Sequence, residues 1–267
     1  MRTPFLAAAL GLGLAGCLVG DARTPAAGGD DDGNGSQGSN GSNGSNNPTP
    51  KVDVTVDRTT VASELHTNNP INVTVTGSGG FAGDVALSGS IVDSTGTAIA
   101  GWAVDFNPAT VTLSANGTGS SVATLKIPGL NTGLAGMLKI TGASAATTGT
   151  NIATIPVNVT NQVTFSVKVD NATGKCVYTA DSGTVGTPVK LSLGTKVRFF
   201  NTGTANLVIH SGGVISHQGQ APNGLADPVT EPNTAYEQMP TGTGAATWYC
   251  HDPATDLSAN DPRFTVQ

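Results

Sequence analysis

Along the chain from Val52 onward, apolar residues alternate with polar ones, and no stretch keeps the 3.6-residue apolar period of a helix. A period of two is typical of a β-strand that buries one face, as Val52, Val54 and Val56 would do. Gly, Asn and Pro turns separate the alternating segments, which lie at residues 52–56, 71–75, 85–87, 102–106, 111–113, 121–127, 137–140 and 152–159. This spacing predicts a β-sandwich over residues 51–160.

The alternation restarts after Asn161 and Gln162. The later segments lie at residues 163–169, 189–193, 197–200, 207–209, 235–239, 247–249 and 264–266. They predict a second sandwich over residues 161–267. The fold class expected for the chain is therefore all-β, with two tandem β-sandwiches.

Charge and motifs exclude several function classes. The chain has 12 Lys and Arg residues against 18 Asp and Glu residues, and charged residues make up only 11% of it. With no basic patch, nucleic acid is not an expected partner. The sequence contains no Gly-x-Ser-x-Gly elbow, no His-Glu-x-x-His helix motif and no phosphate-binding glycine loop. We therefore do not expect an enzyme.

The N-terminus has the features of an export signal. Arg2 precedes an apolar run at residues 5–15, which is too short for a membrane-spanning helix of about 20 residues. The run ends in Leu-Ala-Gly-Cys at Cys17, which resembles the lipobox of bacterial lipoproteins. The resemblance implies a signal peptide at residues 1–17 and an acyl anchor on Cys17 that holds the protein on a membrane. The alternative is ordinary cleavage beside a cysteine present by chance.

The same resemblance implies a location. The protein would lie in the bacterial cell envelope as a lipid-anchored chain. Leu18, rather than Asp, follows Cys17. This favours the outer membrane, with the protein periplasmic or surface-exposed. Residues 18–50, rich in Gly, Ser and Asn, predict a disordered tether because they contain too little apolar surface for a core.

The first predicted sandwich has the pattern of a known module. Residues 106–114, followed by Asn116, Gly117 and Thr118, resemble bacterial immunoglobulin-like domains. The resemblance covers residues 51–160 and implies a spacer or a binding face. His66 is the only histidine in this region, and we expect a solvated side chain in a turn.

Three of the four histidines and two of the three cysteines fall in the second predicted sandwich. Residues 193–201 followed by His210, and the segment Trp-Tyr-Cys-His ending at His251, resemble the cupredoxins, the small blue-copper proteins with a Greek-key sandwich. The resemblance covers residues 161–267. It implies copper as cofactor, with His210 as the upstream ligand and Cys250 as the thiolate ligand. Such a site transfers electrons to a redox partner, whose identity the sequence does not give.

The sequence departs from the cupredoxin pattern after Cys250. Asp252, Pro253 and Ala254 stand where a further His or Met would be expected. The second imidazole would come from His251 or from His217, and the sequence does not decide between them. A thiolate-free copper(II) site made by the three histidines is a further alternative.

A disulfide is the competing expectation for Cys250. An exported protein enters an oxidising compartment, and once Cys17 is acylated two thiols remain, Cys176 and Cys250. A Cys176–Cys250 bridge excludes a copper–thiolate bond. In that case the chain is a metal-free adhesion or interaction module built from β-sandwiches.

Overall fold

The computed structural model describes residues 48–145, 147, 151–169, 176–179, 188–216, 218, 229–251 and 261–267. They belong to one compact unit that spans Asn46–Gln267. The predicted signal peptide, Cys17 and nearly all of the predicted tether lie outside the described residues. Within the described part of the chain the regular structure is entirely β, and no helix there is long and apolar enough to cross a membrane.

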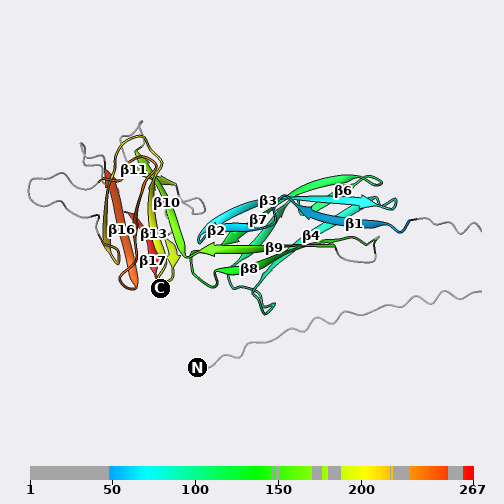
Figure 1. Cartoon of the computed structure of the whole chain (residues 1–267), viewed down its shortest axis with the longest axis horizontal. Coiled ribbons are helices and arrows are strands. Elements are labelled where there is room, and N and C mark those ends of the chain that lie inside the picture. Colours follow the sequence, from blue (N-terminus) through cyan, green and yellow to red (C-terminus); the bar gives the residue numbers. More distant parts are fainter. Residues whose placement is uncertain are drawn as a thin grey trace, which may run out of the picture. The chain divides into compact units, whose positions relative to one another are not determined.

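The first sandwich consists of two sheets (Figure 1). Its strands are β1 (Lys51–Val56), β2 (Val61–Glu64), β3 (Thr67–Ser78), β4 (Gly83–Val92), β5 (Ala103–Asn107), β6 (Thr110–Leu113), β7 (Thr118–Ile127), β8 (Ala135–Ala143) and β9 (Asn151–Thr160). One sheet has the order β1-β3-β7-β5 and the other has the order β2-β9-β8-β4-β6. Only β2 and β9 pair in parallel; the other pairs are antiparallel.

The core of this sandwich follows the alternation of the sequence. In β3, Ile71, Val73 and Val75 are fully buried while the residues between them face outward. Leu138 and Ile140 of β8 are fully buried from the opposite sheet. Fully burying one such side chain contributes about 1.5–3 kcal/mol to the transfer free energy, so the apolar faces of the two sheets hold each other together.

The second sandwich also has two sheets. Its strands are β10 (Gln162–Val169), β11 (Cys176–Thr179), β12 (Val189–Leu191), β13 (Lys196–Asn201), β14 (Val208–Gly213), β15 (Ala235–Gln238), β16 (Gly244–His251) and β17 (Asp261–Val266). The sheet orders are β11-β10-β13-β15 and β12-β17-β16-β14. Phe165 stacks on Phe199 at 5.8 Å and on Phe264 at 5.7 Å between ring centroids, and all three rings are fully buried. These rings join the two sheets at the centre of the core.

The predicted all-β fold with tandem sandwiches is confirmed. Every predicted strand coincides with an observed one, and no sheet combines strands from before and after Asn161. Two observed strands, β2 and β11, were not predicted. Each has only four residues, too few to show a clear alternation.

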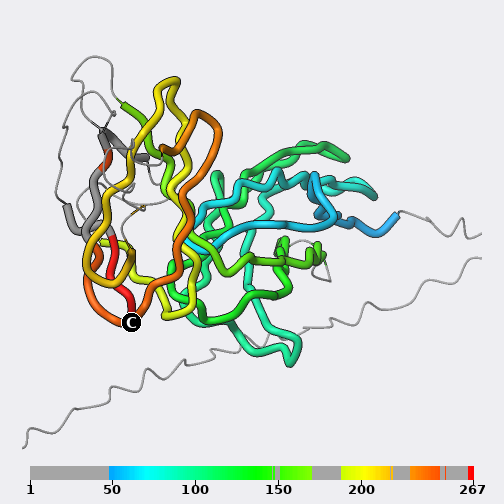
Figure 2. Tube along the Cα trace, turned by 60° about the vertical axis from the view of Figure 1, so that its left-hand side comes forward, coloured from blue at the N-terminus to red at the C-terminus, as the bar shows by residue number. Residues whose placement is uncertain are grey.

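Asn161 is the single residue between β9, the last strand of the first sandwich, and β10, the first strand of the second. The green part of the tube in Figure 2 runs from one sandwich into the other. Its side-chain oxygen accepts hydrogen bonds from Thr195 Oγ1 at 3.1 Å and Asn131 Nδ2 at 3.3 Å, while its Nδ2 donates to the Gly194 carbonyl at 2.9 Å. A polar network of the two sandwiches therefore holds the residue that joins them.

Glu64, at the end of β2, is the charged member of this junction. Its Oε1 accepts a hydrogen bond from Gln162 Nε2, and its Oε2 accepts one from Thr164 Oγ1, each at 2.6 Å. The backbone N–H of Leu65 donates to the Gln162 carbonyl at 3.0 Å. Since Gln162 is 7% exposed, its amide depends on Glu64 for a strong acceptor.

Candidate functional site

Cys250 lies inside β16, in the core of the second sandwich. Its side chain is fully buried and disulfide-bonded. β16 pairs with β14 so that Cys250 lies directly opposite Ile209, which is also fully buried. Residues directly opposite each other in an antiparallel pair share one face of the sheet, and here that face is the core.

His210 is the next residue of β14 and lies opposite Tyr249. Neighbouring residues of a strand occupy opposite faces, so His210 lies on the other face from Cys250. His210 is half-buried there. The register therefore does not bring together the two residues that the cupredoxin resemblance predicted as ligands of one copper ion.

The other predicted site residues are distributed as follows. His251 is the last residue of β16 and lies opposite Val208, so its backbone position is on the same face as that of His210. Cys176 is the first residue of β11, opposite Val169 of β10, and β11 also contacts β16. His217 lies outside the described residues. The choice between His217 and His251 as a ligand stays a prediction.

Metal-binding side chains do not converge in the part of the chain that the structure describes. No group of three or more His, Cys, Asp or Glu residues there is arranged to hold an ion. Asn201, which ends the strand of the cupredoxin-like segment, has a structural task instead. Its Nδ2 donates to the carbonyls of Ala205 at 2.8 Å and Thr230 at 2.9 Å, and its Oδ1 accepts from the Gly203 N–H at 2.9 Å. It thereby fixes the turn that leads into β14.

Gln218 is a second residue that holds β14, and the sequence analysis missed it. Its Oε1 accepts a hydrogen bond from the Ile209 N–H at 2.9 Å, and its own N–H donates to the Ile209 carbonyl at 3.3 Å. Gln218 is 7% exposed. No local pattern could have revealed it, because its partners depend on how the chain folds back after β14.

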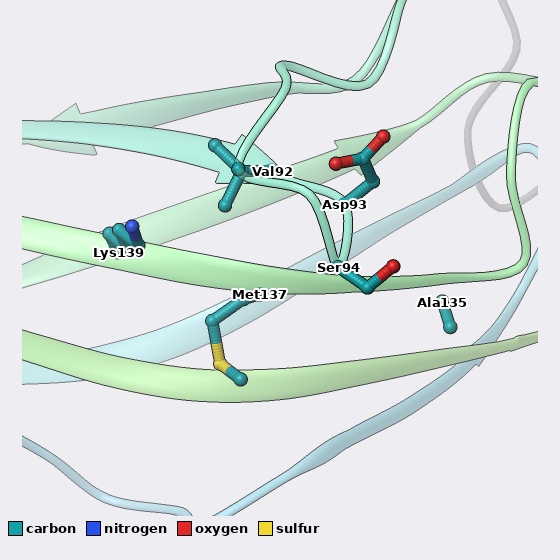
Figure 3. Close-up of a pocket in the computed structure, with 8 residues that line it drawn as sticks. Val92, Asp93, Ser94, Ala135, Met137 and Lys139 are labelled. Carbon is teal, nitrogen blue, oxygen red and sulfur yellow. The ribbon is translucent and has the colours of Figure 1, made fainter.

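The first sandwich contains a cavity that the sequence analysis did not anticipate (Figure 3). It has a volume of about 470 Å³ and lies between the loop after β4 and the outer face of β8. The lining residues are Val92, Asp93, Ser94, Gly96, Ala135, Gly136, Met137 and Lys139. A cavity of this size accommodates a small molecule or a few residues of a peptide.

Asp93 organises the loop that forms one wall of this cavity. Its Oδ1 accepts hydrogen bonds from Thr95 Oγ1 at 2.6 Å, the Thr95 N–H at 2.8 Å and the Thr97 N–H at 2.9 Å. These hydrogen bonds lower the pKa of Asp93. The bond from the Thr95 hydroxyl has the largest effect, and the bond from the Thr97 N–H has the next largest. The wall is therefore held in place by an ionised carboxylate.

His66 differs from its expected environment. It was predicted to be solvated, but it is half-buried, in the turn between β2 and β3, with a φ of 58°. The backbone N–H of His66 donates to the Pro128 carbonyl at 3.0 Å. Burial lowers the pKa of His66, because the imidazolium loses hydration there.

No known protein family and no curated protein matches this chain in sequence. Similar solved structures share little sequence with it. Domains 4 and 5 of the S-layer protein SbsC are 15% identical over 41% of this chain, with a TM-score of 0.28. The Salmonella enterica SafA pilin in complex with the SafB chaperone is 15% identical, covering 80% of this chain and 95% of that chain, with a TM-score of 0.29. The D00-D0 domain of intimin is 8% identical, and the match covers 81% of this chain and 97% of the intimin chain, with a TM-score of 0.28.

A family 123 glycoside hydrolase from Clostridium perfringens is 12% identical over 44% of this chain, with a TM-score of 0.33. The chain spans only 53% of the length of the SbsC structure and 30% of the length of the hydrolase. All of these TM-scores are below 0.5. The functional proposal therefore rests on the residues of this chain alone.

Proposed function

We propose that this chain is a lipid-anchored protein of the bacterial cell envelope whose two β-sandwiches form a metal-free interaction module. The lipobox at Cys17 supports the anchor, and the Gly, Ser and Asn-rich residues 18–50 supply a tether. A Gly/Ser-type coil of about 30 residues has an r.m.s. span of roughly 30 Å, so the sandwiches reorient freely in front of the membrane. We assign the chain no catalytic activity.

One observation carries the choice between a copper protein and a metal-free module. Cys250 is buried in a disulfide on the core face of its sheet, while His210 lies on the other face. A blue-copper site needs a Cys thiolate and imidazoles converging on one ion. A disulfide sulfur supplies no thiolate, so the arrangement favours the structural role for Cys250.

The bonding partner of Cys250 in this proposal is Cys176. The chain has three cysteines, and the lipobox reserves Cys17 for the acyl anchor. Cys176 begins β11, a strand that contacts β16. The bridge would join the sheet containing β11 to the sheet containing β16, and so would lock the two layers of the sandwich.

Intact-mass analysis of the mature lipoprotein, purified in detergent from the bacterium that expresses it, tests the anchor and the disulfide together. We expect no thiol alkylation under native conditions, two alkylations after denaturation and reduction, and a mass increase from the acyl chains that disappears in Cys17→Ala. Two reactive thiols in the unreduced, denatured protein would overturn the proposal.

Copper(II) titration of the same preparation separates the competing function. We expect no intense thiolate-to-copper absorption in the visible range. An intense band that is lost in Cys250→Ser would restore the electron-transfer hypothesis. A weak d–d band that survives Cys250→Ser but is lost in His210→Ala would instead show a thiolate-free site and would contradict the metal-free module.

A further inference from the structure

We propose that the cavity beside β8 binds a carboxylate that is joined to a small apolar group, with Lys139 as the anion-binding residue. This inference concerns the first sandwich, and it goes beyond the proposed function because it names a site and a class of ligand. Its test does not depend on the state of Cys250.

The outer face of the sheet arranges two kinds of residue in neighbouring rows. Met137 of β8 lies opposite Val92 of β4 on one side and Pro156 of β9 on the other. Two residues along β8, Lys139 lies between Ser90 of β4 and Thr154 of β9 in the same manner. The buried neighbours Leu138 and Ile140 face the core, so both rows face outward. An apolar row therefore lies beside a row of one ammonium and two hydroxyl groups.

Lys139 is available for a ligand. It is exposed, and within the described part of the chain its ammonium makes no ion pair and no hydrogen bond. The hydroxyls of Ser90 and Thr154 are likewise exposed and make no hydrogen bond to another described residue. Directly opposed residues in a sheet have Cβ atoms about 4.5–5.5 Å apart, so the Lys139 ammonium can share an anion with the hydroxyl of either neighbour. Charge-assisted hydrogen bonds from an ammonium favour a carboxylate acceptor.

The rest of the cavity selects the body of the ligand. Val92 and Met137 are half-buried and form an apolar floor next to Lys139. In Figure 3, Lys139 lies on one side of Met137, and Ser94 and Asp93 lie on the other. The ionised carboxylate of Asp93 repels a second negative charge, which favours a monoanion held at the Lys139 end over a phosphate or sulfate dianion. Met side chains adapt to irregular apolar groups such as a branched aliphatic chain.

Two sources could supply this chemistry: the C-terminal residue of a peptide, or a free short-chain fatty acid. Isothermal titration of the mature lipoprotein in detergent, with a blank titration into detergent alone, distinguishes them. The probes are N-acetyl-Gly-Gly-Leu, the same peptide as its C-terminal amide, and hexanoate. For ligands of this size we expect a Kd on the order of 0.1–1 mM.

We expect at least one of the two acids to bind, and the peptide amide to bind about tenfold or more weakly. Lys139→Gln should weaken binding of the acid by about tenfold, while Lys51→Gln, which removes another exposed lysine of the same sandwich, should change it less than about twofold. Unchanged melting temperatures confirm that both variants fold. Binding of the acid and the amide with equal affinity, full binding by Lys139→Gln, or no heat from either acid at about 10 mM would overturn the proposal.

Discussion

Ile209 of β14 lies directly opposite Cys250 of β16, and both side chains are fully buried. Because neighbouring residues of a strand lie on opposite faces, this pairing places His210, the neighbour of Ile209, on the outer face of the sheet. A shift of one residue would place His210 opposite Cys250, on the core face, where an imidazole and a thiol could approach one ion. The observed register instead places His210 opposite Tyr249, on the other face of the sheet from Cys250.

Removal of the disulfide should destabilise the second sandwich. With Cys176 as the partner, the bridge closes a loop of about 74 residues and stabilises the fold by roughly 4 kcal/mol in the chain-entropy model. We expect Cys250→Ser to lower the free energy of unfolding by an amount of this order, as measured by urea denaturation.

The matched control for this experiment is Cys176→Ser. Both single variants and the double variant should have similar stability, because each loses the same bond, and a reductant should destabilise the wild type alone. A Cys176→Ser variant as stable as the wild type and still sensitive to reductant would show that Cys250 has another partner.

Apart from the short β2 and β11, the strands were predictable because each obeys a local rule, whereas the register was not. The period-two burial of Ile71, Val73 and Val75 is visible in the sequence itself, as is that of Val163, Phe165 and Val167. The face of the sheet on which His210 and Cys250 lie depends on the register between β14 and β16. Contacts between residues far apart in the sequence determine this register. The cavity beside β8 was missed for the same reason.

The stability of the protein should depend on pH through His66. Because burial lowers the pKa of His66 in the folded state, the unfolded chain takes up the proton first as the pH falls. The contribution of neutral His66 to the free energy of unfolding is therefore fully present above a pH of about 6.5, and it is lost as the pH falls below that value.

The comparison variant is His66→Asn, since Asn tolerates the positive φ of this position. Urea denaturation between about pH 8 and pH 5 should show a steeper loss of stability for the wild type than for His66→Asn. The other three histidines are common to both proteins and cancel in the difference. Parallel pH profiles would show that His66 titrates equally in the folded and unfolded states.

The hydrogen bonds of Glu64 should couple the two sandwiches energetically. A double-mutant cycle of Glu64→Ala and Thr164→Val should give a coupling free energy of about 1 kcal/mol, because the Thr164 hydroxyl donates to the Glu64 carboxylate at 2.6 Å. The cycle of Glu231→Ala and Thr164→Val, two residues that no hydrogen bond joins, should be additive. Equal coupling in both cycles would mean that the Glu64 contact contributes nothing specific.

Gly129 should not tolerate a side chain. A Cβ atom there would lie 2.4 Å from the Lys190 carbonyl oxygen and 2.8 Å from Val189 Cγ1. We expect Gly129→Ala to destabilise the protein by about 1–3 kcal/mol. Gly242→Ala is the control, since a Cβ there meets no atom within 4 Å, and its effect should be within about 0.5 kcal/mol. Thermal melting of both variants measures the difference.

The pairing of β1 with β3 determines how the first sandwich responds to a mechanical pull. The proposed tether would join β1 at Lys51, which lies opposite Ser78 at the far end of β3. β3 begins at Thr67, close to Glu64 of β2, which pairs with Thr160. A force applied between the tether and Thr160 therefore acts along β1. Its six pairs with β3 are sheared together and are not opened one after another. If residues 18–50 are the proposed membrane tether, a pull on the anchored end loads β1 in shear, and all six of its pairs with β3 resist it at once.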